Sequence, residues 1–368
     1  MSRLSVSVLI TTLPMKLRNR ISLARWPVSF SWLAGFVLYV GWVSYSAAVV
    51  SAATVGPLFD APPIPVASDE VLLVSTRALG TDCNDKSMSR GLRCQRLETG
   101  GQPIWRTADW RVLLSSPAHL PTIIYVHGNR VTTGQDRVEG MRVYRSLKSH
   151  CRLKGPIRFV IWSWPSEQIR GPINDFLVKA QRTNPAAWQL AWLLDQLPVE
   201  APISLVGYSY GSRVVSGATH LLAGGRLGPL TLGERTHPHR PPVRAALIAA
   251  AYDADWIQSG RFYDQALGQL ERLVLVTNKL DPAMRFYHLG NGRGRMHALG
   301  KSGVYQPWRL GSATRRLQQI DVTREVGRSH ALVDYLAAER KMSLLWHQLM
   351  KPNNASEKSS ASYLSHVR

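Results

Sequence analysis

A serine between two glycines lies where an apolar segment gives way to a segment with helical character. Gly207, Ser209 and Gly211 match the pattern G-x-S-x-G, with apolar residues 203–206 before it and a helix-compatible run, residues 212–225, after it. A strand that turns sharply into a helix strains the central serine and exposes its hydroxyl group. Side chains at the two glycines would collide in such a turn, and the start of the helix places backbone N–H groups near developing negative charge. Ser209 is therefore the candidate nucleophile.

An aspartate after a later apolar segment is the candidate for an acid that orients a catalytic histidine. Asp281 follows residues 273–277, which are typical of a strand, and an acid in this place can hold an imidazole in position. Asp253 and Asp255, which follow the preceding apolar segment, are the competing candidates. Asp281 also precedes Pro282, so a plain role in a turn stays open.

The candidate base is His330, which we expect to open a helix near the end of the domain. The order serine, acid, histidine is the one expected when a G-x-S-x-G serine is the nucleophile, and Ser209, Asp281 and His330 follow it. His288 and His297 are less well placed, because they would crowd the acid's own loop. The alternative for His330 is a histidine that only caps its helix.

A third apolar segment, residues 122–126, ends in His127, Gly128 and Asn129. A loop after an early strand can supply one backbone N–H group of an oxyanion hole, and the residue after the nucleophile supplies the other. We expect the N–H groups of Asn129 and Tyr210 to have these roles. His127 precedes the serine in the chain, so we expect it to orient this loop through hydrogen bonds rather than to act as the base.

The elements that must position these residues alternate along the chain. Short apolar runs rich in β-branched residues are separated by stretches with helical periodicity. This alternation indicates a mostly parallel central sheet with helices on both faces, the α/β class, and continuously apolar runs fit strands buried on both sides. The expected strands are residues 71–75, 122–126, 157–162, 203–206, 243–251 and 273–277, and the expected helices are residues 136–149, 173–197, 210–224 and 330–349.

The composition excludes several classes of protein. Hydrophobic residues make up 45% and charged residues 19% of the 368 residues, a balance that excludes wholesale disorder. Three cysteines exclude a disulfide scaffold and a four-cysteine zinc site, although Cys83 and Cys94 could close a loop in an oxidising compartment. No metal or organic cofactor is expected, because metal-binding spacings are missing near the candidate residues.

The chain is strongly basic, with 45 lysines and arginines against 24 acidic residues and a net charge of +21. Such a charge favours anionic partners, namely phospholipid headgroups, acidic polysaccharide or nucleic acid, although a merely basic protein has the same composition. No helix-turn-helix, zinc-finger or ribonucleoprotein-type motif accompanies it, so no nucleic-acid partner is expected. The sequence does not define an oligomeric state.

The N-terminal region has the features of a membrane-directed segment. No charge occurs between Arg25 and Asp60, and residues 28–53 are long enough to span a bilayer. The basic residues precede this segment, so the N-terminus should stay in the cytoplasm and the rest should be exported. An uncleaved signal anchor and a long signal peptide both stay open. The expected organisation is a basic N-terminus at 1–27, a membrane-directed segment at 28–53, a linker at 54–69, the main domain at 70–349 and a disordered tail at 350–368.

Residues 282–320 form a long insert without an acidic residue. The insert lies between the candidate acid and the candidate base, so it should fold near the mouth of the site, and a structureless loop of this length is often functional. We expect Arg293, Arg295 and Lys301 to favour an anionic ester substrate or an anionic membrane surface. The alternative is a solvated basic loop.

The span from about residue 70 to residue 349 resembles the α/β-hydrolase superfamily, and most of all a bacterial family of largely uncharacterised, lipase- and esterase-like hydrolases. The similar stretches occur in the right order and cover most of the domain. They are LVSTR (73–77), IIYVHGN (123–129), FVIWSWPS (159–166), VGYSYGSRV (206–214), ALIAAAYDAD (246–255), LVTNKLDPAM (275–284) and GRSHALVDY (327–335).

This resemblance implies an α/β-hydrolase fold and a serine hydrolase that forms an acyl-enzyme on a small-molecule or lipid ester, with no agreed substrate. The residues carried over are, as the triad, Ser209, Asp281 and His330, and, as the oxyanion hole, Asn129 and Tyr210. Similar proteins usually have an apolar residue after the His-Gly pair, whereas this chain has Asn129 and Arg130. The alternatives are a catalytically inactive α/β-hydrolase that binds anionic ligands at the cell envelope, and a polyanion-binding protein.

Overall fold

The computed structural model describes residues 69–350 apart from 100–101, 116–119, 152, 154, 286 and 288–296. All of these belong to the second of two compact units, Ala47–Arg368. The predicted basic N-terminus and membrane-directed segment lie outside the described residues, as do the linker up to residue 68, the tail from residue 351, and Arg293 and Arg295. Within the described part of the chain, no helix combines the length and the apolar character that a bilayer crossing needs.

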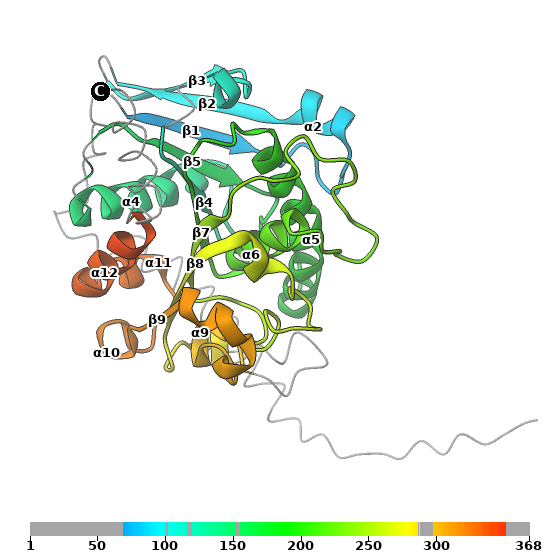
Figure 1. The fold of residues 1–368 in the computed structure, drawn as a ribbon. Coiled ribbons are helices and arrows are strands. Elements are labelled where there is room, and N and C mark those ends of the chain that lie inside the picture. The colour runs from blue at the N-terminus through cyan, green and yellow to red at the C-terminus, as the bar shows by residue number, and fades with distance from the viewer. Residues whose placement is uncertain are drawn as a thin grey trace, which may run out of the picture. The chain divides into compact units, whose positions relative to one another are not determined.

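The described residues form one sheet of nine strands, in the order β3-β2-β1-β5-β4-β6-β7-β8-β9. The pairs β1-β5, β5-β4, β4-β6, β6-β7, β7-β8 and β8-β9 are parallel, whereas β2 and β3 form an antiparallel extension next to β1 at one edge (Figure 1). The strands are β1 Glu70–Ser75, β2 Arg93–Glu98, β3 Ile104–Ala108, β4 Thr122–Val126, β5 Arg158–Ser163, β6 Ile203–Tyr208, β7 Val243–Ile248, β8 Leu270–Thr277 and β9 Leu317–Asp321.

Helices cover both faces of this sheet (Figure 1). The longer ones are α4 Gln135–His150, α5 Pro172–Gln196, α6 Tyr210–Leu222 and α12 Glu339–Met350. The shorter ones are α2 Asp85–Gly91, α3 Val112–Ser115, η1 Ala266–Gln269, α7 Pro282–Arg285, α9 Leu299–Ser302, η2 Pro307–Arg316, α10 Thr323–Val326 and α11 Leu332–Leu336.

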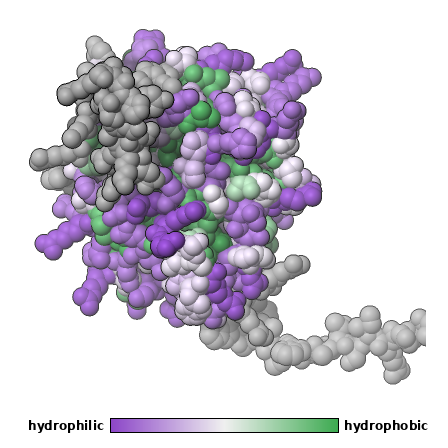
Figure 2. Space-filling model, in the orientation of Figure 1, coloured by the Kyte–Doolittle hydropathy of each residue, from purple (hydrophilic) through white to green (hydrophobic). Residues whose placement is uncertain are grey.

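The core is divided by the sheet, as the continuously apolar strands predict. Side chains of α5 and α6 pack on one face and those of α4 and α12 on the other, each in its own large apolar cluster. Every residue of β4, β5 and β6 is buried. Hydrophilic residues cover most of the outer surface on the side shown in Figure 2, with small hydrophobic patches between them. The predicted α/β class with a mostly parallel sheet is confirmed for the described residues.

Two details of the prediction are wrong. The insert at 282–320 is not a structureless loop, because it contains short helices and strand β9, whose residues pair in parallel with β8. The expected helix at 330–349 is broken into α11 and α12, and His330 precedes the first of them in extended chain, since the intervening Ala331 has φ −70° and ψ 129°. His330 therefore does not open a helix.

The three cysteines are free thiols in the structure. Cys83 is partly exposed, whereas Cys94 on β2 and Cys151 after α4 are buried. The pairing of Cys83 with Cys94 that an oxidising compartment would permit is not formed.

Candidate active site

The turn between β6 and α6 has the conformation that the glycine pattern predicts. Ser209 has φ 52° and ψ −116°, a strained conformation for a residue with a side chain. A Cβ atom on Gly207 would lie 2.7 Å from the Ser212 Cα, and one on Gly211 would lie 2.1 Å from the Val126 carbonyl oxygen. Both positions therefore need glycine, and the turn places Ser209 at the carboxyl end of β6.

Three residues from distant parts of the chain meet at this turn. The Ser209 Oγ lies 3.1 Å from Nε2 of His330, and Nδ1 of His330 lies 2.7 Å from Oδ2 of Asp281. Asp281 follows β8 and is fully buried, whereas 22% of the His330 side chain is exposed. The predicted nucleophile, base and acid are thus within hydrogen-bonding distance in the order Ser209, His330, Asp281. A hydroxyl group that faces an imidazole held by a carboxylate is arranged for proton removal.

The competing acids have other partners. Asp253 accepts a hydrogen bond from the indole N–H of Trp256 at 3.1 Å, and Asp255 forms an ion pair with Arg261 at 3.2 Å. His297 accepts a hydrogen bond from Ala254 on its backbone oxygen, and His288 lies outside the described residues. The structure therefore favours Asp281.

Asp281 has two further hydrogen-bond donors. The hydroxyl of Tyr335 donates to Oδ2 at 2.6 Å, and the backbone N–H of Met284 donates to Oδ1 at 3.1 Å. Tyr335 is not among the site residues that the sequence predicts. Its only signal was an aromatic residue five positions after His330, within a stretch that resembles other hydrolases.

The loop that carries His330 is fixed from two sides. Asn278, at the end of β8, donates from Nδ2 to the carbonyl oxygens of Gly327 at 2.8 Å and Ser329 at 3.3 Å. The ring of Tyr208 stacks on the imidazole with 5.4 Å between ring centroids, and its hydroxyl donates to the His330 carbonyl oxygen. Burial raises the pKa of Tyr208, so its hydroxyl remains a neutral donor. The imidazole is therefore held in place before any substrate binds.

The loop after β4 lies against the nucleophile. A Cβ atom on Gly128 would lie 3.3 Å from the Ser209 Cβ. Tyr210 is the first residue of α6, a position whose backbone N–H has no partner inside the helix. Gly128, in the loop after β4, and Tyr210, at the start of α6, therefore both lie next to Ser209.

His127 is a buried structural residue rather than a second base. Its Nε2 accepts a hydrogen bond from the Trp164 backbone N–H at 3.3 Å, and its Nδ1 lies 2.9 Å from the Gly128 carbonyl oxygen. Burial lowers the pKa of His127 to about 4, so the ring is neutral at physiological pH. These contacts agree with the predicted role in orienting the loop.

The polar residues that follow the His-Gly pair form hydrogen bonds with Asp175, on the first turn of α5. Its Oδ2 accepts hydrogen bonds from Nε of Arg130 at 2.9 Å and from Nδ2 of Asn129 at 3.3 Å, and its Oδ1 accepts one from Nζ of Lys179 at 3.0 Å. Burial alone would raise the pKa of Asp175, but hydrogen bonds from Ile169, Arg130 and Lys179 hold it below its usual value. The unusual Asn129-Arg130 pair is therefore an anchor to α5.

Of the basic residues expected at the mouth of the site, only Lys301 is described. It lies on α9, whose backbone is joined to the segment after β7 by the hydrogen bond from Gly300 N to Ala250 O at 2.9 Å. Its proposed contact with an anionic substrate stays a prediction.

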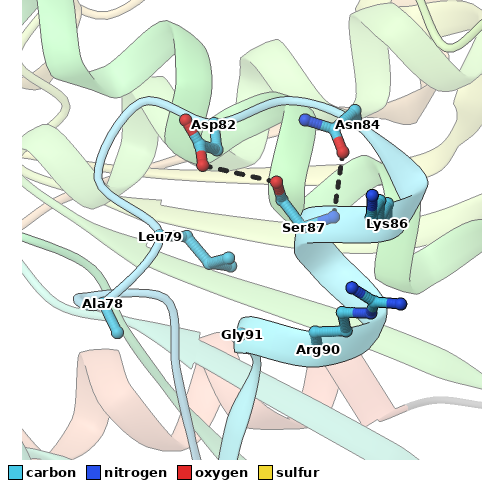
Figure 3. A pocket seen from close by; sticks show the side chains of 8 residues that line it. All are labelled: Ala78, Leu79, Asp82, Asn84, Lys86, Ser87, Arg90 and Gly91. Atoms are coloured by element: carbon cyan, nitrogen blue, oxygen red, sulfur yellow. Dashed lines mark hydrogen bonds between the residues drawn. The ribbon is translucent and has the colours of Figure 1, made fainter.

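The described residues include no site for a metal ion. No cluster of histidine, cysteine, aspartate or glutamate side chains there could hold a metal ion. A pocket between the turn after β1 and α2 is lined by eight residues, among them Asp82, Asn84 and Lys86, and most of their side chains are exposed (Figure 3). Ser87 bridges Asp82 and Asn84 within it, and no triad residue lines it.

The strand order, the strained serine at a strand-to-helix turn and the acid and histidine after later strands define an α/β-hydrolase fold, so the resemblance to that superfamily is confirmed at the level of the fold. No protein-family model matches the chain, and no curated protein matches its sequence.

Several solved structures are similar to the chain. Carboxyl esterase 2 from the mycorrhizal fungus Tuber melanosporum is 15% identical, over 84% of this chain and 97% of that one, with a TM-score of 0.39. The poly(3-hydroxybutyrate) depolymerase LpqC from Bordetella parapertussis is 14% identical, over 72% and 92%, with a TM-score of 0.38. Esterase B from Lactobacillus rhamnosis is 10% identical, over 87% and 99%, with a TM-score of 0.37.

Proposed function

We propose that this protein is a serine hydrolase that cleaves a carboxylic ester or thioester through an acyl-enzyme. The observation that carries the proposal is the hydrogen-bonded series from Ser209 through His330 to the buried Asp281, at 3.1 Å and 2.7 Å, with the serine in a strained turn. A serine in an ordinary turn is rarely strained, and it rarely faces an imidazole that is hydrogen-bonded to a buried carboxylate.

In this mechanism His330 removes the proton from the Ser209 hydroxyl as its oxygen attacks the ester carbonyl carbon. Asp281 holds the imidazole in the tautomer with a proton on Nδ1 and stabilises the imidazolium ion. The proton on Nε2 then passes to the departing alcohol or thiol. Water attacks the acyl-enzyme in the second half of the reaction, with His330 again as the base.

The tetrahedral intermediates carry a negative oxygen next to the turn. The backbone N–H groups of Tyr210 and Asn129 would stabilise it, each by about 3 kcal/mol. The hydrogen bonds of Asp175 to Asn129 and Arg130, and the position of Tyr210 at the start of α6, support this assignment because they fix the two sides of the hole before the reaction. No observation favours the alternative of a catalytically inactive binding protein.

We further propose that the substrate is a small-molecule or lipid ester and that the protein acts outside the cytoplasm, attached through residues 28–53. The uncharged run behind a basic N-terminus supports this location. A C-terminal fusion to a phosphatase that is active only outside the cytoplasm tests it. Phosphatase activity that is lost when residues 28–53 are deleted supports export, and activity that is absent from the intact fusion contradicts it.

The reaction is tested with a panel of chromogenic esters of different acyl chain length and charge, on the full-length protein. We expect hydrolysis that is lost, by a factor of at least about a thousand, in Ser209→Ala. Ser216→Ala is the matched control, because Ser216 is also a buried serine, in the middle of α6, but its hydroxyl bonds to Tyr252. Equal activity in all three proteins would contradict the proposal.

A further inference from the structure

Two donors share one oxygen of the buried acid. Oδ2 of Asp281 accepts from Nδ1 of His330 at 2.7 Å and from the hydroxyl of Tyr335 at 2.6 Å. We infer that Tyr335 is a positioning residue for the hydrolytic reaction, which fixes the orientation of Asp281 and withdraws part of its negative charge from His330. This inference rests on the proposed function, because it assigns a role within the same triad.

The histidine and this tyrosine come from one short segment. His330 and Tyr335 are five residues apart, on either side of the extended Ala331, and Tyr335 lies on α11 with no exposed surface. Its ring packs edge-on against Tyr208, the same side chain that stacks on His330, with 6.5 Å between centroids. A single segment therefore delivers both the base and the hydroxyl group that holds the acid.

The chemistry of a buried carboxylate requires such a donor. A carboxylate removed from water is stable only when hydrogen-bond donors replace the lost water molecules. Asp281 has no exposed surface, and Met284 supplies the donor for its other oxygen. Burial and the charge of Asp281 raise the pKa of Tyr335, so its hydroxyl stays protonated and donates at any pH at which the protein is folded.

The hydrogen bond from Tyr335 weakens the attraction between the Asp281 carboxylate and the imidazolium form of His330. A hydrogen bond to the carboxylate disperses its negative charge and reduces its attraction for the imidazolium ion. Loss of the tyrosine hydroxyl should therefore make the protonated, inactive form of the base more stable and move the acid limb of the rate profile to higher pH.

Other titratable groups near His330 could also change the pH profile, so the test must distinguish their effects from that of Tyr335. Glu139, on α4, has a pKa that burial raises to about 7, and it is close enough to interact with the charge of His330. The titratable and charged groups that face the imidazole or its neighbour Tyr208 include Tyr208 itself at the end of β6, Asp281 after β8, Glu139 on α4, and Asp334 and Tyr335 on α11.

The test is the pH profile of kcat/KM for Tyr335→Phe in the full-length protein, with an ester that the wild type hydrolyses. We expect kcat to fall roughly tenfold with KM nearly unchanged, and the acid limb to move up by about half a pH unit. Tyr144→Phe is the matched control, because Tyr144 is also buried and donates at 2.7 Å to a carboxylate, Asp69, which lies at the amino end of β1. The acid limb is also measured in Glu139→Gln, alone and combined with Tyr335→Phe. These variants show whether the titration of Glu139, rather than that of His330, causes the limb.

An acid limb in Tyr335→Phe that coincides with those of the wild type and Tyr144→Phe would overturn the inference, as would a limb at lower pH. A shift that disappears in the Glu139→Gln background would overturn it as well. Failure of the proposed function gives a different result, because the wild-type protein itself would then hydrolyse no ester.

Discussion

Gly211 packs directly against the end of β4, so closely that a Cβ atom there would lie 2.1 Å from the carbonyl oxygen of Val126. This contact joins the start of α6, which follows the nucleophile, to the strand that leads into the His-Gly loop. The approach of two backbones therefore sets the distance between the nucleophile and the oxyanion loop.

Replacement of this glycine should damage both stability and activity. In Gly211→Ala the methyl group would collide with backbone atoms that cannot rotate away, so we expect a loss of roughly 2–4 kcal/mol in the free energy of unfolding and little remaining activity. Denaturant unfolding measures the first and ester hydrolysis the second. Gly268→Ala is the control, because its added methyl group would meet only the Ala223 Cβ at an ordinary 3.6 Å. Equal stability of the two variants would contradict this account of the turn.

Two variants separate the effect of Asp175 on stability from its effect on activity. Asp175→Asn leaves the buried Lys179 without its carboxylate, so we expect a loss of about 3 kcal/mol in unfolding free energy together with a fall in kcat. In the double variant Asp175→Asn, Lys179→Met the unpaired charge is gone and most of the stability should return. The introduced asparagine offers one amide oxygen and an NH2 group in place of the carboxylate that accepts from Asn129 and Arg130, so the loop stays poorly anchored and kcat should remain low. Recovery of kcat along with stability would show that the anchor has no role in the oxyanion loop.

Glu139 should make the folded protein less stable at alkaline pH. Burial raises its pKa from 4.5 to about 7, and the hydroxyl of Tyr125 donates to it at 3.0 Å. Between pH 4.5 and about 7 the folded protein therefore holds a proton that the unfolded chain has released, and the stability from this group falls as the pH rises through that range. Thermal unfolding of Glu139→Gln at pH 5 and pH 8 measures the effect. We expect the variant to gain stability relative to the wild type at the higher pH, whereas an unchanged difference between the two would refute the burial of this acid.

The sequence predicts the strands of the sheet that are buried on both faces, because continuous apolar runs such as residues 122–126 have no other stable place. It does not reveal β9, since only Leu317 and Ile320 are apolar among the residues Leu317–Asp321 of this edge strand, so no continuous apolar run marks it. The sequence predicts a continuous helix at 330–349, whereas Ala331 is extended and His330, before α11, reaches Ser209.

The proposed triad could be derived from chain order and strand ends, whereas its supporting residues could not. Tyr335 and Asp175 act through contacts across 54 and 46 residues, with Asp281 and Asn129 respectively. Local sequence carries no record of such pairing, because a buried tyrosine or an aspartate on a helix is common in any domain. Only the folded arrangement shows that each is a hydrogen-bond partner of the site.

The central claim is that Ser209 is an activated nucleophile, and covalent labelling with a fluorophosphonate probe tests it most directly. The full-length protein, Ser209→Ala and the control Ser216→Ala are treated with the probe, and the labelled residue is located by mass spectrometry. We expect the wild type and Ser216→Ala to be labelled on Ser209 and Ser209→Ala to remain unlabelled. A well-folded wild-type protein without label, or label that persists in Ser209→Ala, would contradict it.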